Sequence, residues 1–95
     1  VGGRKMSDVK DTLAEREKIH GDYRQVAAVA QSIKDALDCH RALFQDKFSP
    51  AQRESLDQIA TKMARIVCGD PNIIDHWLDI EGYARLVRKI LEEQK

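Results

Sequence analysis

The sequence predicts an all-α protein, a compact bundle of about four helices. Apolar residues recur at helical spacing in four segments, no segment alternates apolar and polar residues, and Gly or Pro separates the segments. The 95 residues are 42% hydrophobic and 34% charged, which is typical of a folded globular domain. Residues 6–95 are expected to form a single helical domain. Residues 1–5 are interpreted as a tag remnant or a disordered segment.

The first two helices are expected at residues 8–19 and 23–43. Ser7 can cap the first helix, Gly21 can take the left-handed conformation that ends it, and Asp22 can cap the second. One side of the first helix carries Val9, Leu13, Arg16 and His20. The apolar stripe of the second helix consists of Val26, Val29, Ala30, Ile33, Leu37, His40 and Phe44. We interpret His40 as a histidine of the core.

The third helix is expected at residues 50–68 and the fourth at about 73–92. Ser49 is a strong N-cap for the third helix because Pro follows it directly and Gln52 can complete a capping box. The Gly-Asp-Pro sequence at residues 69–71 ends this helix, since proline cannot extend the hydrogen-bond ladder. The short connection predicts that the third and fourth helices pack antiparallel.

Composition excludes several classes of protein. Sixteen basic and sixteen acidic residues cancel, so no overall charge favours nucleic acid, and nucleic-acid binding is not expected. No apolar run approaches the ~20 residues needed to span a bilayer, and no signal peptide is expected. Cys39 and Cys68 lie far apart, which favours reduced thiols in a cytosolic protein over a disulfide framework or a zinc site.

Polar residues border the predicted apolar stripes of the last two helices. Asp75 and Asp79 are one turn apart on the fourth helix, ~6 Å at Cβ. On the third helix Lys62 flanks the stripe, whereas Arg65 is expected to point further outward. Antiparallel packing would bring Lys62 close to Asp79. We call Lys62, Arg65, Asp75 and Asp79 the polar seam.

Two interpretations of the polar seam are open. In the first, Lys62 and Asp79 form a structural ion pair, and His76 and Tyr83 are hydrogen-bonded in the core. In the second, the two carboxylates hold a hard cation such as Mg²⁺, and the two cationic side chains receive phosphate. Both depend on the same packing of the third helix against the fourth.

The turn between the first two helices is a second candidate site. It presents an imidazole, a carboxylate and a phenol from His20, Asp22 and Tyr23, which could contact a ligand. A helix end followed by a helix cap accounts for Gly21 and Asp22 without any ligand. The sequence contains no glycine-rich phosphate loop, and neither cysteine has a flanking base.

Several segments together resemble a family of small phage and prophage proteins of undefined function. They cover nearly all of the chain after residue 12 and are Leu13–Arg16, His20–Tyr23, Phe48–Glu54, Ile59–Ile66 with the Gly-Asp-Pro that follows, and Asp75–Ala84. More distantly, the layout is similar to that of the MazG-like all-α nucleoside triphosphate pyrophosphohydrolases. In those enzymes an E-E-x-x-E helix and an E-x-x-D helix bind Mg²⁺. The ion activates a water molecule for attack on the phosphate chain of a nucleotide.

The resemblance implies roles for the polar residues. Asp75, His76 and Asp79 would occupy the second acidic motif, and the two aspartates would hold any Mg²⁺. The first acidic motif is not matched, because the third helix offers only Glu54 and Asp57, which project away from the seam. Nucleotide binding with degenerate or absent hydrolysis is therefore the favoured function. Its expected ligand-binding residues are Lys62, Arg65, His20, Asp22 and Tyr83.

Such a phage-encoded protein is expected to work in the cytoplasm of a bacterial host cell and to form homo-oligomers, since the known relatives suggest oligomers. A Mg²⁺-dependent nucleoside triphosphate pyrophosphohydrolase is one alternative, so the resemblance leaves open whether the protein is an enzyme. A protein-interaction module that acts on a host factor is the other alternative, because the chain is neutral and has no catalytic set.

Overall fold

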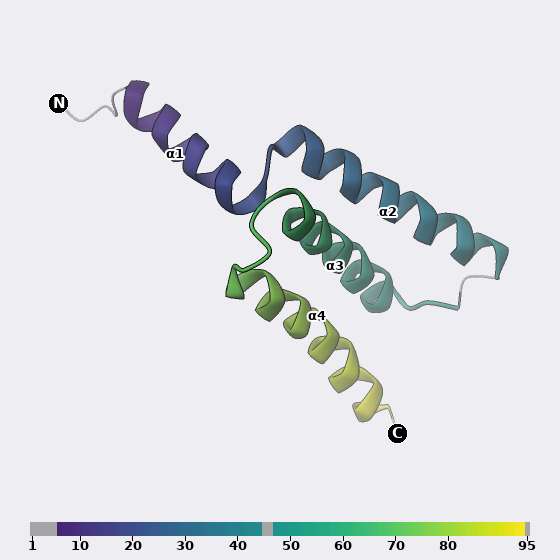
Figure 1. The fold of residues 1–95 in the computed structure, drawn as a ribbon. Coiled ribbons are helices and arrows are strands. Elements are labelled where there is room, and N and C mark those ends of the chain that lie inside the picture. The colour runs from purple at the N-terminus through teal and green to yellow at the C-terminus, as the bar shows by residue number, and fades with distance from the viewer. Residues whose placement is uncertain (1–5, 45–46, 95) are drawn as a thin grey trace.

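The computed structural model describes residues 6–44 and 47–94, and side chains from residue 12 onward. All regular secondary structure in these residues is helical, which confirms the all-α class. The helices, labelled in Figure 1, are α1 (Met6–His20), α2 (Tyr23–Leu43), α3 (Pro50–Cys68) and α4 (Ile74–Glu93). Each begins and ends within about two residues of the bounds expected from the sequence. The tag interpretation of residues 1–5 lies outside the described residues.

Helix α3 occupies the centre of the molecule. Helix α2 packs along one side of it and α4 along another, whereas α1 extends away and approaches α2 and α3 only near its C-terminal end (Figure 1). The expectation of a compact bundle is wrong, because the chain measures 56 × 28 × 28 Å and its radius of gyration is 17.0 Å. A compact domain of this length has a radius of gyration of about 12 Å. The largely polar sequence of α1 explains why it does not fold back along the other helices.

The predicted helix caps are confirmed at two of the turns. The Ser49 side chain accepts from the Gln52 amide at 3.2 Å, and the Ser49 amide donates to the Gln52 side chain at 2.8 Å. The Asp22 carboxylate accepts from the Arg24 amide at 2.9 Å. Gly21 has φ +87°, the left-handed conformation expected of a glycine at a helix end. Local sequence therefore sets where α2 and α3 begin.

The core is small and is built from short side chains. The buried apolar residues among those described are Val26, Ala30, Ala60 and Ala64. The apolar stripe of α2 is confirmed at its N-terminal half, but His40 is exposed and stacks on the exposed ring of Phe44, so its interpretation as a core histidine is wrong. The residue that is buried near this end of α2 is Arg41. At this turn the side of α2 that faces α3 carries Arg41, which meets a carboxylate of α3 instead of an apolar core.

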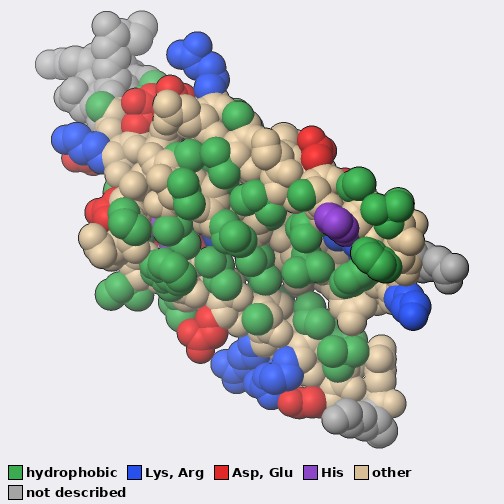
Figure 2. All heavy atoms as spheres, turned by 45° about the vertical axis from the view of Figure 1, so that its right-hand side comes forward, with side chains coloured by type: hydrophobic (Ala, Val, Ile, Leu, Met, Phe, Trp, Pro, Cys, Tyr) green, Lys and Arg blue, Asp and Glu red, His purple; other side chains and the backbone are tan. Residues whose placement is uncertain are grey.

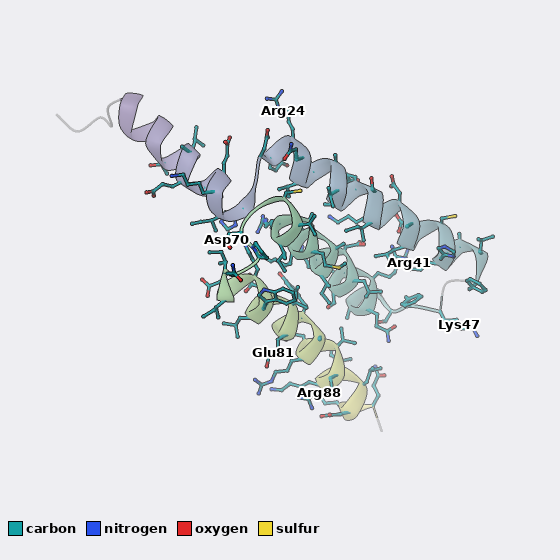
Figure 3. The ribbon with its side chains drawn as sticks, viewed as in Figure 1. Arg24, Arg41, Lys47, Asp70, Glu81 and Arg88 are labelled. Atoms are coloured by element: carbon teal, nitrogen blue, oxygen red, sulfur yellow. The ribbon has the colours of Figure 1, made fainter. Side chains whose placement is uncertain are left out.

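Arg41 joins the C-terminal end of α2 to the start of α3. Its guanidinium pairs with Asp38 on α2, lies 3.7 Å from the carboxylate of Asp57 on α3, and sits over the ring of Phe48 with 5.9 Å to the centroid. In Figure 3 Arg41 lies toward α3, whereas Arg24 at the other end of α2 points away from the molecule. A buried cation therefore takes the place of apolar packing at this end of the helix pair.

Many large apolar side chains remain exposed. Hydrophobic side chains spread over much of the visible face in Figure 2. Those at least half exposed are Leu13, Tyr23, Leu43, Phe44, Val67, Ile74, Trp77, Leu78 and Leu86. Single exposed apolar residues are ordinary, but a collection of this size on a small chain is typical of a surface that binds something. None of the helices in the described part of the chain is long and apolar enough to span a membrane.

Candidate functional site

The two inter-helix turns at the centre of the molecule touch backbone to backbone. A Cβ atom on Gly21 would lie 2.7 Å from backbone atoms of Cys68, and one on Gly69 would lie 2.4 Å from the Ile19 carbonyl oxygen. That carbonyl accepts from the Asp70 amide at 3.2 Å. Glycine is required at both turns because only a residue without Cβ allows this approach. The contact places the end of α1 beside the start of α4.

A pair of histidines lies at this contact. The rings of His20, at the end of α1, and His76, in the first turn of α4, are 5.0 Å apart and meet edge to face. His76 is fully buried, and its Nε2 lies 3.3 Å from the Ile19 carbonyl oxygen. The expectation that His76 is hydrogen-bonded in the core is therefore confirmed. The buried Nδ1 of His20 has no hydrogen-bond partner among the described residues.

The surroundings of His20 are cationic. Burial lowers the pKa of this histidine, and the nearby positive charges of His76, Arg65, Arg16 and Lys62 lower it further. Each of these charges disfavours protonation of the His20 imidazole. The same field attracts an anion to this part of the molecule.

A direct ion pair joins α3 to α4 at the polar seam. Lys62 Nζ lies 2.9 Å from the Asp79 carboxylate, as the antiparallel packing predicts. The hydrogen bond and the charge of Lys62 lower the pKa of Asp79, although burial opposes them. Asp75 is exposed one turn away. Since Lys62 already neutralises Asp79, these donors fit Mg²⁺ poorly, and no group of three or more metal-ligating side chains occurs among the described residues.

A pocket opens on the other side of α3, between α1, α2 and α3. Its volume is about 420 Å³. Three lining side chains are cations, Arg16 on α1, Lys34 on α2 and Arg65 on α3, whereas Glu17 is the one carboxylate among the described residues of the wall. The remaining lining residues are Leu13, His20, Gly21, Tyr23, Val26, Ala27, Ala30, Gln31 and Thr61. We call this the α1–α3 pocket.

The structure separates the residues expected to bind a ligand. His20 and Arg65 line the α1–α3 pocket, whereas Lys62 is held by Asp79 on the side of α3 that faces α4. The carboxylate of Asp22 caps α2 and is not part of the pocket wall. Tyr83 is half-buried on α4 and lines a separate hollow. The set therefore does not form one site.

Sequence reasoning did not assign Arg16, Tyr23 or Lys34 to one site. Arg16 and His20 were recognisable as one face of α1, because they are four residues apart. Lys34 had no such signal, since its role depends on α1 reaching the side of α2 that carries it. The pocket is a tertiary feature that helical periodicity within single helices does not reveal.

Comparison of the chain with models of protein families, with curated proteins and with solved structures finds no match. The relationship to small phage proteins and to MazG-like enzymes therefore stays a prediction from the sequence motifs. The site is assigned from the geometry of the described residues.

Proposed function

We propose that the protein binds a nucleotide or a related phosphate ligand in the α1–α3 pocket, as a phage-encoded MazG-like protein without efficient hydrolysis. The observation that carries the proposal is the excess of positive charge in the pocket wall. Arg16, Lys34 and Arg65 come from three different helices and face Glu17 as the one opposing charge among the described lining residues. In a chain with no net charge, such a local excess favours an anionic ligand.

The two arginines suit phosphate in particular. A guanidinium donates two parallel hydrogen bonds to phosphate oxygens, which gives geometric selectivity as well as charge. Arg16 and Arg65 also raise the potential at His20, whose buried Nδ1 lacks a partner. An anion beside this imidazole would favour its protonated form, and both ring nitrogens would then be donors.

The rest of the wall suits the remainder of a nucleotide. Val26, Ala27 and Ala30 form an apolar surface along α2, and the exposed ring of Tyr23 lies at its N-terminal end. An aromatic ring beside an apolar surface is a common way to hold a nucleobase. The volume of about 420 Å³ falls within the range of small-molecule sites.

Binding in this pocket does not require Mg²⁺. Three cations oppose a divalent ion there, and the carboxylates of the polar seam lie on α4, outside the wall of the pocket. The proposal therefore favours binding over the pyrophosphohydrolase alternative. Under it, a nucleoside triphosphate binds at least as tightly in excess EDTA as in Mg²⁺, because Mg²⁺ offsets part of the charge that the cationic wall attracts, and no pyrophosphate is released.

The proposal is tested by titrating the purified protein with ATP and with inorganic pyrophosphate in a calorimeter. Arg65→Met and Arg16→Met should each weaken binding by about tenfold or more, because a charge-assisted hydrogen bond contributes roughly 1.5–3 kcal/mol. Arg88→Met is the matched control, since Arg88 is exposed on α4 and pairs with Glu92 there. It should leave the affinity unchanged.

Two results would refute the proposal. The first is no detectable heat at ligand concentrations near ~1 mM for a panel of nucleoside mono-, di- and triphosphates with a folded protein. The second is binding that Arg65→Met and Arg16→Met leave intact. Mg²⁺-dependent release of pyrophosphate that is lost in Asp79→Asn would instead support the enzyme alternative.

A further inference from the structure

The α1–α3 pocket is long, because α1 and α2 lie nearly end to end. In Figure 1 the two helices leave the turn at Gly21 on opposite sides and run in similar directions. Their 15 and 21 residues measure about 54 Å together at the rise of an α-helix, close to the 56 Å length of the molecule. The pocket therefore follows a nearly straight pair of helices across the turn.

The lining residues extend far to either side of this turn. Leu13 is the first of them on α1 and lies about 12 Å along that helix from Gly21. Lys34 is the last on α2 and lies about 20 Å from Gly21 in the other direction. A volume of about 420 Å³ spread over such a length makes a groove and not a round cavity. An extended ligand fills this shape better than a compact one.

The three cations of the wall are spread along the groove. Arg16 lies on α1, before the turn, and Lys34 lies on α2, well after it. Arg65 comes between them, because it lies one helical turn before Cys68, whose backbone touches Gly21. A single phosphate group cannot contact both Arg16 and Lys34, since about 27 Å of nearly straight helix lies between the two residues.

These cations have no counter-charge in the described part of the chain. Ion pairs hold Arg41, Lys62 and Arg88 elsewhere in the molecule. No carboxylate among the described side chains lies within ion-pair distance of the three cations of the pocket wall. Two of the three, Lys34 and Arg65, are half-buried. A row of unpaired cations, partly withdrawn from water, indicates that the negative charges arrive with a ligand.

An aromatic ring lies between the ends of the groove. Tyr23 is 79% exposed at the start of α2, and Val26, Ala27 and Ala30 continue the wall toward Lys34 as an apolar surface. Sites for single-stranded nucleic acid combine the same parts, because a cationic groove follows the phosphates and the bases stack on aromatic rings. The composition of the wall therefore suits nucleotides joined in a chain.

We propose that the α1–α3 pocket binds a short single-stranded oligonucleotide, whose phosphates contact Arg16, Arg65 and Lys34 in turn. This inference rests on the proposed function and names the class of phosphate ligand. The triphosphate of one nucleotide can reach the two arginines near the turn, but its charges lie too close together to reach Lys34 as well. The net charge of zero does not oppose such a ligand, because three cations along one groove match three phosphates.

Two ligands with the same number of phosphates test the inference. A deoxyadenosine trinucleotide with a terminal phosphate and dATP each carry three phosphates, but only the trinucleotide spaces them along a chain. In calorimetric titrations the trinucleotide should bind about tenfold or more tightly than dATP. A plot of log K for the trinucleotide against the logarithm of salt concentration should have a slope of about −2, as expected when three phosphates of a single strand are neutralised.

Lys34→Met tests the far end of the groove. It should weaken trinucleotide binding by about tenfold and leave the affinity for dATP unchanged, which also shows that the variant is folded. Arg65→Met should weaken the binding of both ligands. Lys89→Met is the matched control, because Lys89 is an exposed lysine of α4 outside the pocket, and it should change neither affinity.

The outcomes distinguish this inference from the proposed function. Equal affinities for the trinucleotide and dATP, or an equal loss for both in Lys34→Met, overturn the oligonucleotide and leave nucleotide binding in place if Arg65→Met weakens dATP. A glutamate oligomer of the same charge that competes as well as the trinucleotide also overturns it, because the groove would then accept an acidic peptide. Absence of binding by both nucleotide ligands refutes the inference and the proposed function together.

Discussion

A Cβ atom on Gly69 would lie 2.4 Å from the carbonyl oxygen of Ile19, so the turn between α3 and α4 rests directly on the end of α1. The same carbonyl accepts from the Asp70 amide and lies 3.3 Å from the His76 ring. Gly21 makes the reciprocal approach to Cys68. All four helices therefore meet at one point, where two glycines allow two backbones to touch.

Gly21→Ala and Gly69→Ala should each destabilise the protein. An alanine at position 21 would need a left-handed backbone, and its methyl group would lie 2.7 Å from Cys68. The methyl group of an alanine at position 69 would lie 2.4 Å from the carbonyl oxygen of Ile19. We expect the free energy of unfolding in urea to fall by about 2 kcal/mol or more in each case. Gly82→Ala is the matched control and should leave stability equal or higher by up to about 1 kcal/mol. Equal effects at the three glycines would contradict the contact.

Arg41→Met should loosen the end of the α2–α3 pair. The substitution keeps much of the side-chain volume but leaves Asp57 without its cation beside a half-buried site. We expect a loss of about 1–3 kcal/mol in the free energy of unfolding. Arg24→Met at the exposed N-terminal end of α2 should change stability by no more than about 0.5 kcal/mol. Chemical denaturation of the two variants side by side provides the measurement.

The Lys62–Asp79 ion pair should make the free energy of unfolding depend on pH in the acidic range. The pKa of Asp79 is lower in the folded protein than in the unfolded chain because Lys62 holds the carboxylate. Its contribution is therefore present above the unfolded-state pKa and is lost as pH falls through the folded-state pKa. Asp79→Asn should reduce stability near neutral pH but not at strongly acidic pH. The effect is small because Asp79 is exposed to solvent.

The control for this titration is Asp75→Asn, which removes an exposed carboxylate one turn away. It should not reproduce the neutral-pH loss in a monomeric sample. If Asp79→Asn lowers stability equally at every pH, the loss comes from packing and the charge pair contributes nothing measurable.

His20 should respond to ligand binding by a change of pKa. In the free protein its pKa is lowered by burial and by the charges of His76, Arg65, Arg16 and Lys62. A phosphate group in the α1–α3 pocket would offset these charges and raise the pKa, as proton NMR of the imidazole can record. His40 is exposed at the far end of α2 and serves as an internal control. A ligand that binds without moving the His20 titration lies outside the pocket.

Sequence reasoning was most successful where the relevant signals are local. The capping box of Ser49 and Gln52, the cap at Asp22 and the left-handed Gly21 all depend on neighbouring residues, and all are confirmed. The Lys62–Asp79 contact was also predictable, because a short connection leaves few ways to pack α3 against α4.

Sequence reasoning was less successful where contacts depend on which side of a helix meets its neighbour. His40 continues the apolar stripe of α2, yet it is exposed because the packed side of α2 at that turn carries Arg41 instead. Arg41 is buried beside it through contacts with residues far along the chain. Lys34 joins Arg16 and Arg65 around the α1–α3 pocket only because of the direction in which α1 leaves the molecule.

The direction in which α1 leaves the molecule affects how the chain unfolds. Helix α1 is largely polar and is anchored to its neighbours over its last turns, so its opening costs less free energy than that of α2 or α3. The anchored turns carry Leu13, Arg16, Glu17 and His20, which form one wall of the pocket. A molecule seated there would protect the amide protons of α1 against exchange, while those of α4 would keep their rates.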